Sequence, residues 1–234
     1  MAKKNKDISS SNLIKVKPIT EGQKSVFETW KQGKNQFLFG CAGTGKTFIS
    51  LYLAMQDVLN LQTKYEKVIL VRSLIPTREI GFLPGDEEDK AALYQVPYQN
   101  MVKFMFEQPN EQAFNMLYDR LKNQGSLYFL STSFLRGLTF DNSIIIVDEC
   151  QNLNFHELDT ITTRVGQDSK IIYCGDFSQT DLLKQNERNG LHDFLRILEE
   201  MQEFNCVEFN IGDIVRSGFV RNYLIQKTKL GMGM

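Results

Sequence analysis

The sequence lacks long apolar runs and carries almost no net charge. No stretch approaches the roughly 18 to 20 apolar residues of a membrane span, and the first eleven residues are too polar for a signal peptide. We therefore expect a cytoplasmic protein with no membrane partner. The formal net charge of −1 excludes a strongly basic nucleic-acid protein by overall balance, but it leaves room for a local basic surface.

Cysteine is also scarce. The four cysteines lie far apart and form no pair at the C-x-x-C spacing that zinc sites use, so a zinc site is not expected. A chain of 234 residues buries a sizeable core without disulfide bonds, and we expect reduced, mostly buried thiols. With 42% hydrophobic and 24% charged residues, the composition is typical of one globular domain.

The first 17 residues differ in composition from the rest. They hold five lysines and one aspartate, and residues 1–11 have no apolar periodicity that could drive folding. We expect a disordered basic tail over residues 1–17 and one folded domain over residues 18–234. The tail either touches a nucleic-acid backbone or only aids solubility.

Short apolar runs alternate with longer amphipathic segments in the rest of the chain. The runs that predict β-strands lie at residues 36–39, 67–71, 127–130, 143–147, 170–174 and 206–209. Helical patterns lie at residues 46–60, 155–164 and 191–201. Several runs are apolar on both faces, which is typical of parallel strands covered by helices. The predicted fold class is α/β, a mostly parallel sheet flanked by helices in a single domain.

A glycine-rich motif lies between the first apolar run and the helical pattern that follows it. Residues 40–47 match G-x-x-x-x-G-K-(S/T) in the strand–loop–helix context that this motif requires. Its glycines allow a tight turn whose N–H groups face a phosphate, and the helix N-terminus favours negative charge. We expect Lys46 to neutralise the β- and γ-phosphates of ATP and Thr47 to bind Mg²⁺. The expected nucleotide-binding residues of the loop are Gly40, Cys41, Ala42, Gly43, Thr44, Gly45, Lys46 and Thr47.

Polar side chains follow two further apolar runs. Asp148 and Glu149 come directly after the run at 143–147, where ligands bind in α/β folds. We expect Asp148 to hold the magnesium through its water shell and Glu149 to act as general base. Gln179, beyond the run at 170–174, is expected to sense the γ-phosphate. The alternative there is an ordinary Gly–Asp turn with a capping side chain.

Together these motifs resemble the PhoH-like ATPase family, which is similar to the first motor domain of superfamily 1 helicases. Besides the loop at 40–47, the matching segments are GFLPGD at 81–86, RG-x-T at 136–139, IVDE-x-QN at 146–152, TR-x-G at 163–166, GD-x-x-Q-x-DL at 175–182 and DIVR at 213–216. The resemblance runs from about residue 23 to residue 221. The chain departs from the family pattern at Leu138, Cys150 and Ser217–Gly218, where a second arginine, an alanine and His–Pro are usual.

The resemblance implies a RecA-like P-loop NTPase fold, ATP hydrolysis with Mg²⁺, and work on RNA or single-stranded DNA. It also implies a homo-oligomer, expected as a hexameric ring. In the helicase pattern a glutamine before the loop reads the adenine edge, and Gln23 is the matching residue. The short N-terminus resembles the compact members expected in bacteriophage genomes.

The residues after the second apolar run are the candidates for nucleic-acid binding. Related motors grip a backbone there, and the matching side chains are Arg72, Ser73 and Arg78. Phe82 either stacks on a base or anchors its loop in the core.

Arg216 is the expected arginine finger, which neutralises charge in the transition state. Because one motor domain is visible, we expect Arg216 to reach the phosphate loop of a neighbouring subunit. The alternative is an ion pair on its own domain. The substitutes for the finger are Arg136, Arg164 and Arg188.

Three functions fit these motifs. The first is an ATP-dependent motor or switch on nucleic acid, for which helicase activity is a further prediction. The second is an ATPase coupled to protein assembly, and the third is a small-molecule kinase. The kinase is disfavoured because Asp–Glu at a strand end fits activation of water better than transfer to an acceptor. The sequence does not choose between the first two.

Overall fold

The computed structural model describes residues 7–73, 87–132, 135, 137–176 and 190–230, and of residues 87–93 it describes the backbone. Some residues singled out in the sequence lie outside these ranges: Arg78, Phe82, Arg136, Gln179 and Arg188. Their roles stay predictions.

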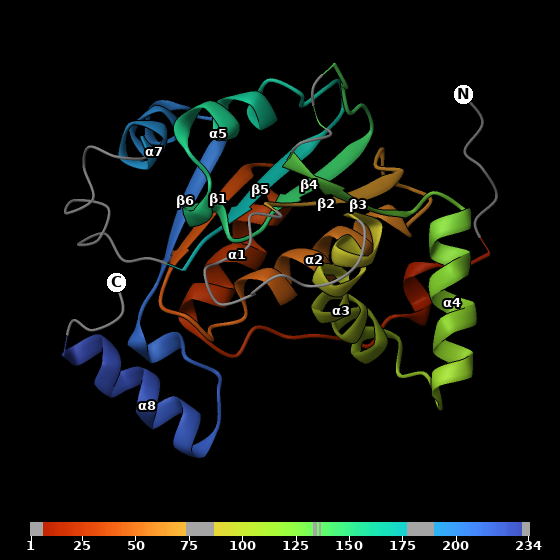
Figure 1. Ribbon diagram of the computed structural model, residues 1–234, viewed down its shortest axis with the longest axis horizontal. Helices are drawn as coiled ribbons and strands as arrows, with labels where there is room; N and C mark the ends of the chain where they lie inside the picture. Colours follow the sequence, from red (N-terminus) through yellow and green to blue (C-terminus); the bar gives the residue numbers. More distant parts are fainter. Residues whose placement is uncertain (1–6, 74–86, 133–134, 136, 177–189, 231–234) are drawn as a thin grey trace.

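A six-stranded parallel sheet forms the centre of the fold (Figure 1). The strands are β1 (Asn35–Gly40), β2 (Lys67–Arg72), β3 (Leu127–Ser131), β4 (Ser143–Val147), β5 (Lys170–Cys174) and β6 (Phe204–Phe209). Their order across the sheet is β3-β2-β4-β5-β1-β6. Each strand predicted from an apolar run is confirmed to within two residues at either end. The predicted α/β fold with a parallel sheet is therefore confirmed.

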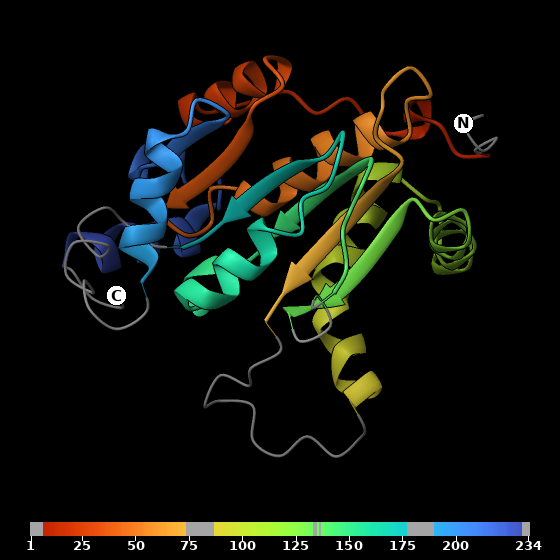
Figure 2. The ribbon, with the colours of Figure 1, turned by 90° about the horizontal axis from the view of Figure 1, so that it is seen from above.

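Helices cover both faces of this sheet (Figures 1 and 2). One core cluster includes α1 (Glu21–Lys31), α2 (Lys46–Val58), α3 (Glu87–Phe106) and α4 (Glu111–Asn123). The other includes α5 (Phe155–Thr162) and α7 (Leu191–Glu200). Helix α8 (Gly218–Lys229) lies at one end of the molecule and buries no side chain. Among the described residues, no helix has the length and apolar character that crossing a membrane requires.

Alternation along the strands explains why both faces are buried. In β4, Ile144 and Ile146 join the core under α1 to α4, whereas Ile145 and Val147 join the core under α5 and α7. Successive side chains of a strand point to opposite faces, so an all-apolar strand serves two cores. The four cysteines are free, and Cys150 and Cys174 are buried.

The order of the strands decides what meets at the carboxyl edge of the sheet. Strand β5 lies between β1 and β4. Since neighbouring strands are about 4.8 Å apart, the ends of β1 and β4 are separated by roughly 10 Å. That gap has room for a phosphate group between the loop after β1 and the acidic residues after β4.

The expected disordered tail is wrong from Ile8 onward. Ile8 and Leu13 are buried in the core beside α2, and the short 3₁₀ turn η1 (Ser10–Asn12) separates them. The Ile14 N–H donates to the carbonyl oxygen of Met105 at 2.8 Å. These apolar residues have no helical or strand period, so their burial depends on surfaces that α2 and α3 provide from elsewhere in the chain. The packed part of the chain begins ten residues before the expected boundary at residue 18.

Lys170 is buried at the start of β5, far from the carboxyl edge. Its side chain is 2% exposed, and Nζ lies 3.9 Å from the centre of the Trp30 ring. The Trp30 indole in turn donates to Asp57 Oδ2 at 2.9 Å. Burial lowers the pKa of Lys170 to about 8, against the opposing charge of Asp57. A buried ammonium is costly, and here an aromatic face and a nearby carboxylate offset part of that cost.

This lowered pKa predicts how stability depends on pH. Between about pH 8 and pH 10, Lys170 is protonated in the unfolded chain and deprotonated in the folded protein. The unfolded state therefore binds more protons, and the free energy of unfolding rises with pH by up to about 1.4 kcal/mol per pH unit because of this residue. We expect Lys170→Met to be more stable than wild type at pH 7 and to lose that advantage as pH rises. Urea unfolding at several pH values measures the difference. The prediction is contradicted if the stability difference between Lys170→Met and wild type does not change with pH. It is also contradicted if Lys67→Met, at the start of β2, shows the same pH-dependent difference.

Candidate active site

A cleft of about 780 Å³ opens at the carboxyl edge of the sheet. Its walls come from the loop after β1, the ends of β2, β4 and β5, helix α3 and the segment before α8. Pockets for small ligands typically have volumes of about 300 to 1,000 Å³. The topology therefore collects most of the residues singled out in the sequence in one cleft of suitable size.

The glycines of the loop at 40–47 have the backbone conformations expected for phosphate binding. Gly40, Gly43 and Gly45 have φ of 114°, 73° and 86°, which other residues rarely adopt. A Cβ atom on Gly40 would collide with the carbonyl oxygen of Phe209. Helix α2 begins at Lys46 directly after Gly45, so its N-terminus faces the cleft. A phosphate there meets free N–H groups and the positive end of the helix dipole.

The ammonium group of Lys46 lies inside the loop. Nζ is 2.6 Å from Asp176 Oδ1 and donates to the carbonyl oxygen of Cys41 at 2.8 Å. The side chain is 4% exposed, so these partners balance the cost of burying its charge. A phosphate that binds the loop must replace or share them. Asp176, which follows β5, thus lies at the same edge of the sheet as the loop.

Thr47 and Asp148 are in direct contact. The Thr47 hydroxyl donates to Asp148 Oδ1 at 2.7 Å, and the Tyr98 hydroxyl donates to Oδ2, also at 2.7 Å. Burial raises the pKa of Asp148, while the bonds from Tyr98 and Thr47 and the charge of Arg72 lower it. A hydroxyl beside a carboxylate matches the oxygen ligands of Mg²⁺.

The donor set of the cleft fits magnesium better than a protein-only metal site. In the part of the chain that the structure describes, no three His, Cys, Asp or Glu side chains are grouped closely enough to hold a metal. Thr47 would supply one oxygen ligand, and Asp148 would hold the metal through its water shell. Mg²⁺ commonly takes one or two protein ligands and completes its shell with phosphate oxygens and water.

Glu149 has an unusual backbone conformation beside Asp148. Its φ and ψ are 53° and 41°, in the left-handed region that side chains other than glycine seldom adopt. Burial raises the pKa of Glu149, and the nearby charges of Asp148 and Asp176 add to the rise. Strained backbone and a raised carboxyl pKa in a cleft are typical of catalytic residues.

Gln151 connects Glu149 to the end of β5. Its amide nitrogen donates to Glu149 Oε2 at 2.6 Å, and its amide oxygen accepts from the N–H of Asp176 at 3.2 Å. The side chain therefore fixes the direction of the Glu149 carboxylate. We assigned Gln151 no role from the sequence, although its position two residues after Glu149 was a usable signal.

Gln23 lies beside the loop, as its predicted role requires. Its amide nitrogen donates to the carbonyl oxygen of Thr44 at 3.1 Å, and its amide oxygen accepts from the N–H of Ile19 at 2.9 Å. Both ends of the amide thus bind backbone and hold the loop against the segment before α1. The contact with an adenine edge stays a prediction.

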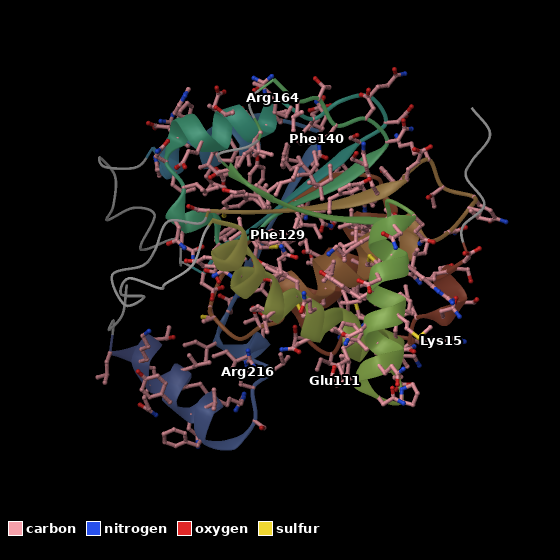
Figure 3. The ribbon with its side chains drawn as sticks, turned by 45° about the vertical axis from the view of Figure 1, so that its right-hand side comes forward. Lys15, Glu111, Phe129, Phe140, Arg164 and Arg216 are labelled. Atoms are coloured by element: carbon pink, nitrogen blue, oxygen red, sulfur yellow. The ribbon has the colours of Figure 1, made fainter. Side chains whose placement is uncertain are left out.

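Arg216 lines the cleft of its own chain (Figure 3), and its reach to the loop of a neighbouring subunit stays a prediction. The N–H of Val215 donates to the carbonyl oxygen of Gly43 at 3.1 Å. The Arg216 side chain packs closely against Gly43, because a Cβ atom at that glycine would lie 2.9 Å from Arg216 Cγ. The reason is the 3₁₀ turn η4 (Ile211–Asp213), which Asp213 anchors by accepting from the N–H of Gly22 at 2.9 Å.

Arg164, a substitute for the finger, lies elsewhere. It is in the segment after α5, where its carbonyl oxygen accepts from the N–H of Phe140. Figure 3 places Arg164 and Phe140 together on one side of the sheet and Arg216 on the other. Arg164 is therefore not positioned to act on a phosphate in this cleft.

Arg72 and Ser73, the candidates for nucleic-acid binding after β2, lie at the cleft and in the interior, and binding of nucleic acid by them stays a prediction. The Arg72 guanidinium lines the cleft and lies 5.6 Å from the centre of the Tyr94 ring. Ser73 is buried. The carboxylates of Asp148 and Glu149 line the same cleft, a neighbourhood that a sequence pattern at a strand end does not reveal.

Comparisons with known proteins match a stretch of the chain that contains this cleft. A family model described as "PhoH-like protein" matches residues 15–226. A PhoH-like protein of Synechocystis is 33% identical over 79% of this chain and 54% of its own length, and Protein PhoH of Escherichia coli is 32% identical over 80% and 51%. This chain thus spans about half the length of these curated relatives.

Solved structures agree with the fold. Two structures of the large terminase from a thermophilic bacteriophage match 90% of this chain and 50% of that chain, with TM-scores of 0.51 and 0.50 and identities of 12% and 14%. The second is a complex with ADP. At such identities the likeness establishes a shared P-loop NTPase fold.

Proposed function

The chain belongs to the PhoH-like protein family, and from this we propose that it hydrolyses ATP with Mg²⁺ and couples hydrolysis to binding or remodelling RNA or single-stranded DNA. One observation carries the ATPase proposal. The phosphate loop, the contact between Thr47 and Asp148, and the acid Glu149 meet in one cleft. This is the set of groups that phosphoryl transfer to water needs.

Each side chain then has a defined task. The loop and Lys46 bind the phosphates, and the ammonium exchanges Asp176 for phosphate oxygens. Thr47 and Asp148 hold Mg²⁺, which supplies positive charge beside the β- and γ-phosphates. Glu149 accepts a proton from the attacking water, and Gln151 keeps its carboxylate in place. Arg216 neutralises the charge that develops on the transferred group from within the same chain.

A protein partner is also part of the proposal. Helix α8 buries no side chain and exposes Phe219 at 82%, with Val220 and Tyr223 also exposed, and the exposed Leu230 follows the helix directly. Exposed apolar groups gathered on one helix favour a protein interface. We propose a homo-oligomer, as a hexameric ring. The same surface supports the alternative, an ATPase coupled to assembly of other proteins.

Measuring ATP turnover alone and with RNA, single-stranded DNA or duplex DNA tests the function. We expect turnover that needs Mg²⁺ and is lost in Lys46→Ala, and we expect single strands to stimulate it. Turnover equal in wild type and Lys46→Ala would contradict the ATPase proposal. Turnover that no nucleic acid changes would favour the assembly ATPase.

Nucleic-acid binding should depend steeply on salt. Each phosphate contact on a single strand adds about 0.7 to the slope of log affinity against log salt. We expect Arg78→Ala to reduce that slope by about this amount without weakening ATP binding, whereas Arg196→Ala on α7 should leave it unchanged. Fluorescence anisotropy with a labelled oligonucleotide and an ATP analogue measures both. Salt-insensitive binding, or none at low salt, counts against a nucleic-acid motor.

A further inference from the structure

Both carboxylate oxygens of Asp148 accept a hydrogen bond from a hydroxyl group. Thr47 donates to Oδ1 and Tyr98 donates to Oδ2, each at 2.7 Å. Thr47 belongs to the phosphate loop, but Tyr98 comes from α3, which is not part of the sheet edge. The carboxylate is thus held from two unrelated elements.

The direction of the bond from Tyr98 follows from its acceptor. An ionised carboxylate can only accept hydrogen bonds, so the Tyr98 hydroxyl gives its proton to Asp148 Oδ2. The Arg72 guanidinium lines the same cleft, and the Tyr94 ring lies 5.6 Å from it. Tyr98 is 2% exposed and its ring packs 5.7 Å from that of Phe129, which leaves the hydroxyl little freedom.

We propose that Tyr98 is a positioning residue that holds Asp148 ready to bind magnesium, an inference that rests on the proposed ATPase function. If a metal binds, the Thr47 oxygen would coordinate it through a lone pair, while the Thr47 proton can still be donated to Oδ1. The bond from Tyr98 is on the other oxygen, Oδ2, and does not compete with these contacts. It keeps the carboxylate from rotating and satisfies an oxygen that is buried away from water.

The origin of Tyr98 on α3 gives the metal site a support outside the sheet. Pro97 and Met101 of the same helix also line the cleft. Pro97 lacks an N–H group, so the helical hydrogen-bond ladder is interrupted directly before Tyr98. The placement of one turn of α3 therefore sets the distance between the hydroxyl and Asp148.

Replacing Tyr98 with phenylalanine removes the hydroxyl and keeps the ring. We expect Tyr98→Phe to need about 10- to 100-fold more Mg²⁺ for metal-dependent nucleotide binding, because lost support of a ligand weakens metal affinity by this factor. Its affinity for nucleotide in EDTA should stay at the wild-type value. Titration of a fluorescent ADP analogue with Mg²⁺, and in EDTA, measures both without turnover.

Tyr173→Phe is the matched control. Tyr173 is fully buried and its hydroxyl bonds to Thr162 at 2.7 Å, on the side of the sheet away from α3. This control loses an equally buried hydroxyl and should keep the wild-type requirement for Mg²⁺. If both variants needed the same additional amount of Mg²⁺, Tyr98 would only contribute to the stability of the fold, and the proposal would be overturned.

The Asp148→Asn background separates positioning from folding. If Tyr98 acts through the carboxylate, Tyr98→Phe should not shift the Mg²⁺ requirement further in that background. The proposal would be overturned if Tyr98→Phe raised the Mg²⁺ requirement further in the Asp148→Asn background. It would also be overturned if the Tyr98→Phe variant bound nucleotide more weakly than wild type in EDTA, or if it kept the wild-type Mg²⁺ requirement. If wild type itself binds nucleotide without any Mg²⁺ dependence, the proposed ATPase function fails first.

Discussion

Replacing Glu149 with glutamine should give a protein that binds ATP and does not cleave it. Glutamine keeps the shape of the side chain and a partner for Gln151, but it cannot accept a proton from water. Loss of a general base lowers turnover by about 10²- to 10⁴-fold. The phosphate loop and Asp148 stay intact, so the affinity for ATP should be unchanged. Turnover and equilibrium binding of a fluorescent ATP analogue, measured on the same preparation, separate the two effects.

The control for this variant is Glu203→Gln. Glu203 is exposed just before β6, at the opposite edge of the sheet from the cleft, and its replacement should leave turnover unchanged. Equal turnover in wild type and Glu149→Gln would remove Glu149 from the role of base. Loss of ATP binding in Glu149→Gln would point to a structural role in the loop instead.

Replacing Arg216 with alanine should lower turnover by about 10³- to 10⁵-fold, the range measured for arginine fingers. Arg216 lies beside Gly43 of its own chain, so each cleft already holds the arginine that we propose as its finger. We therefore expect that Arg216→Ala mixed with Lys46→Ala stays inactive, since every subunit lacks either its finger or its loop lysine. The measurement is the turnover of mixed oligomers whose composition has been verified.

Arg221→Ala is the matched control for Arg216→Ala. Arg221 is an exposed arginine on α8, close in sequence to Arg216, and its replacement should leave turnover at the wild-type value. Recovery of activity in the mixed oligomers would show that the finger acts between subunits. That outcome would restore the expectation drawn from the sequence and would contradict the position of Arg216 seen here.

Several features could be predicted from the sequence because local patterns carry them. An apolar run identifies a strand, since burial on two faces requires apolar side chains at consecutive positions. The glycines of the loop at 40–47 are recognisable because the turn needs positive φ at defined positions. Asp148 follows such a strand directly, so its place at the sheet edge follows from the parallel topology.

Other features depend on contacts between distant parts of the chain. Tyr98 reaches Asp148 from α3, and Arg216 reaches Gly43 from beyond β6. Arg72 shares the cleft with the carboxylates of Asp148 and Glu149, which lie far from it in the sequence. No local pattern encodes such pairs, because the chain between them forms several strands and helices whose packing sets the distance.

The sequence by itself therefore determined the strands, the phosphate loop and the acidic pair, each of which follows from the properties of adjacent residues. Only the tertiary structure decided that the segment from Ile8 is packed, that Arg216 faces its own loop, and that Tyr98 supports Asp148. The physical reason is the range of the interactions. Backbone conformation and alternating burial act over a few residues, whereas a hydrogen bond or an ion pair in the cleft requires two segments that the complete fold brings together.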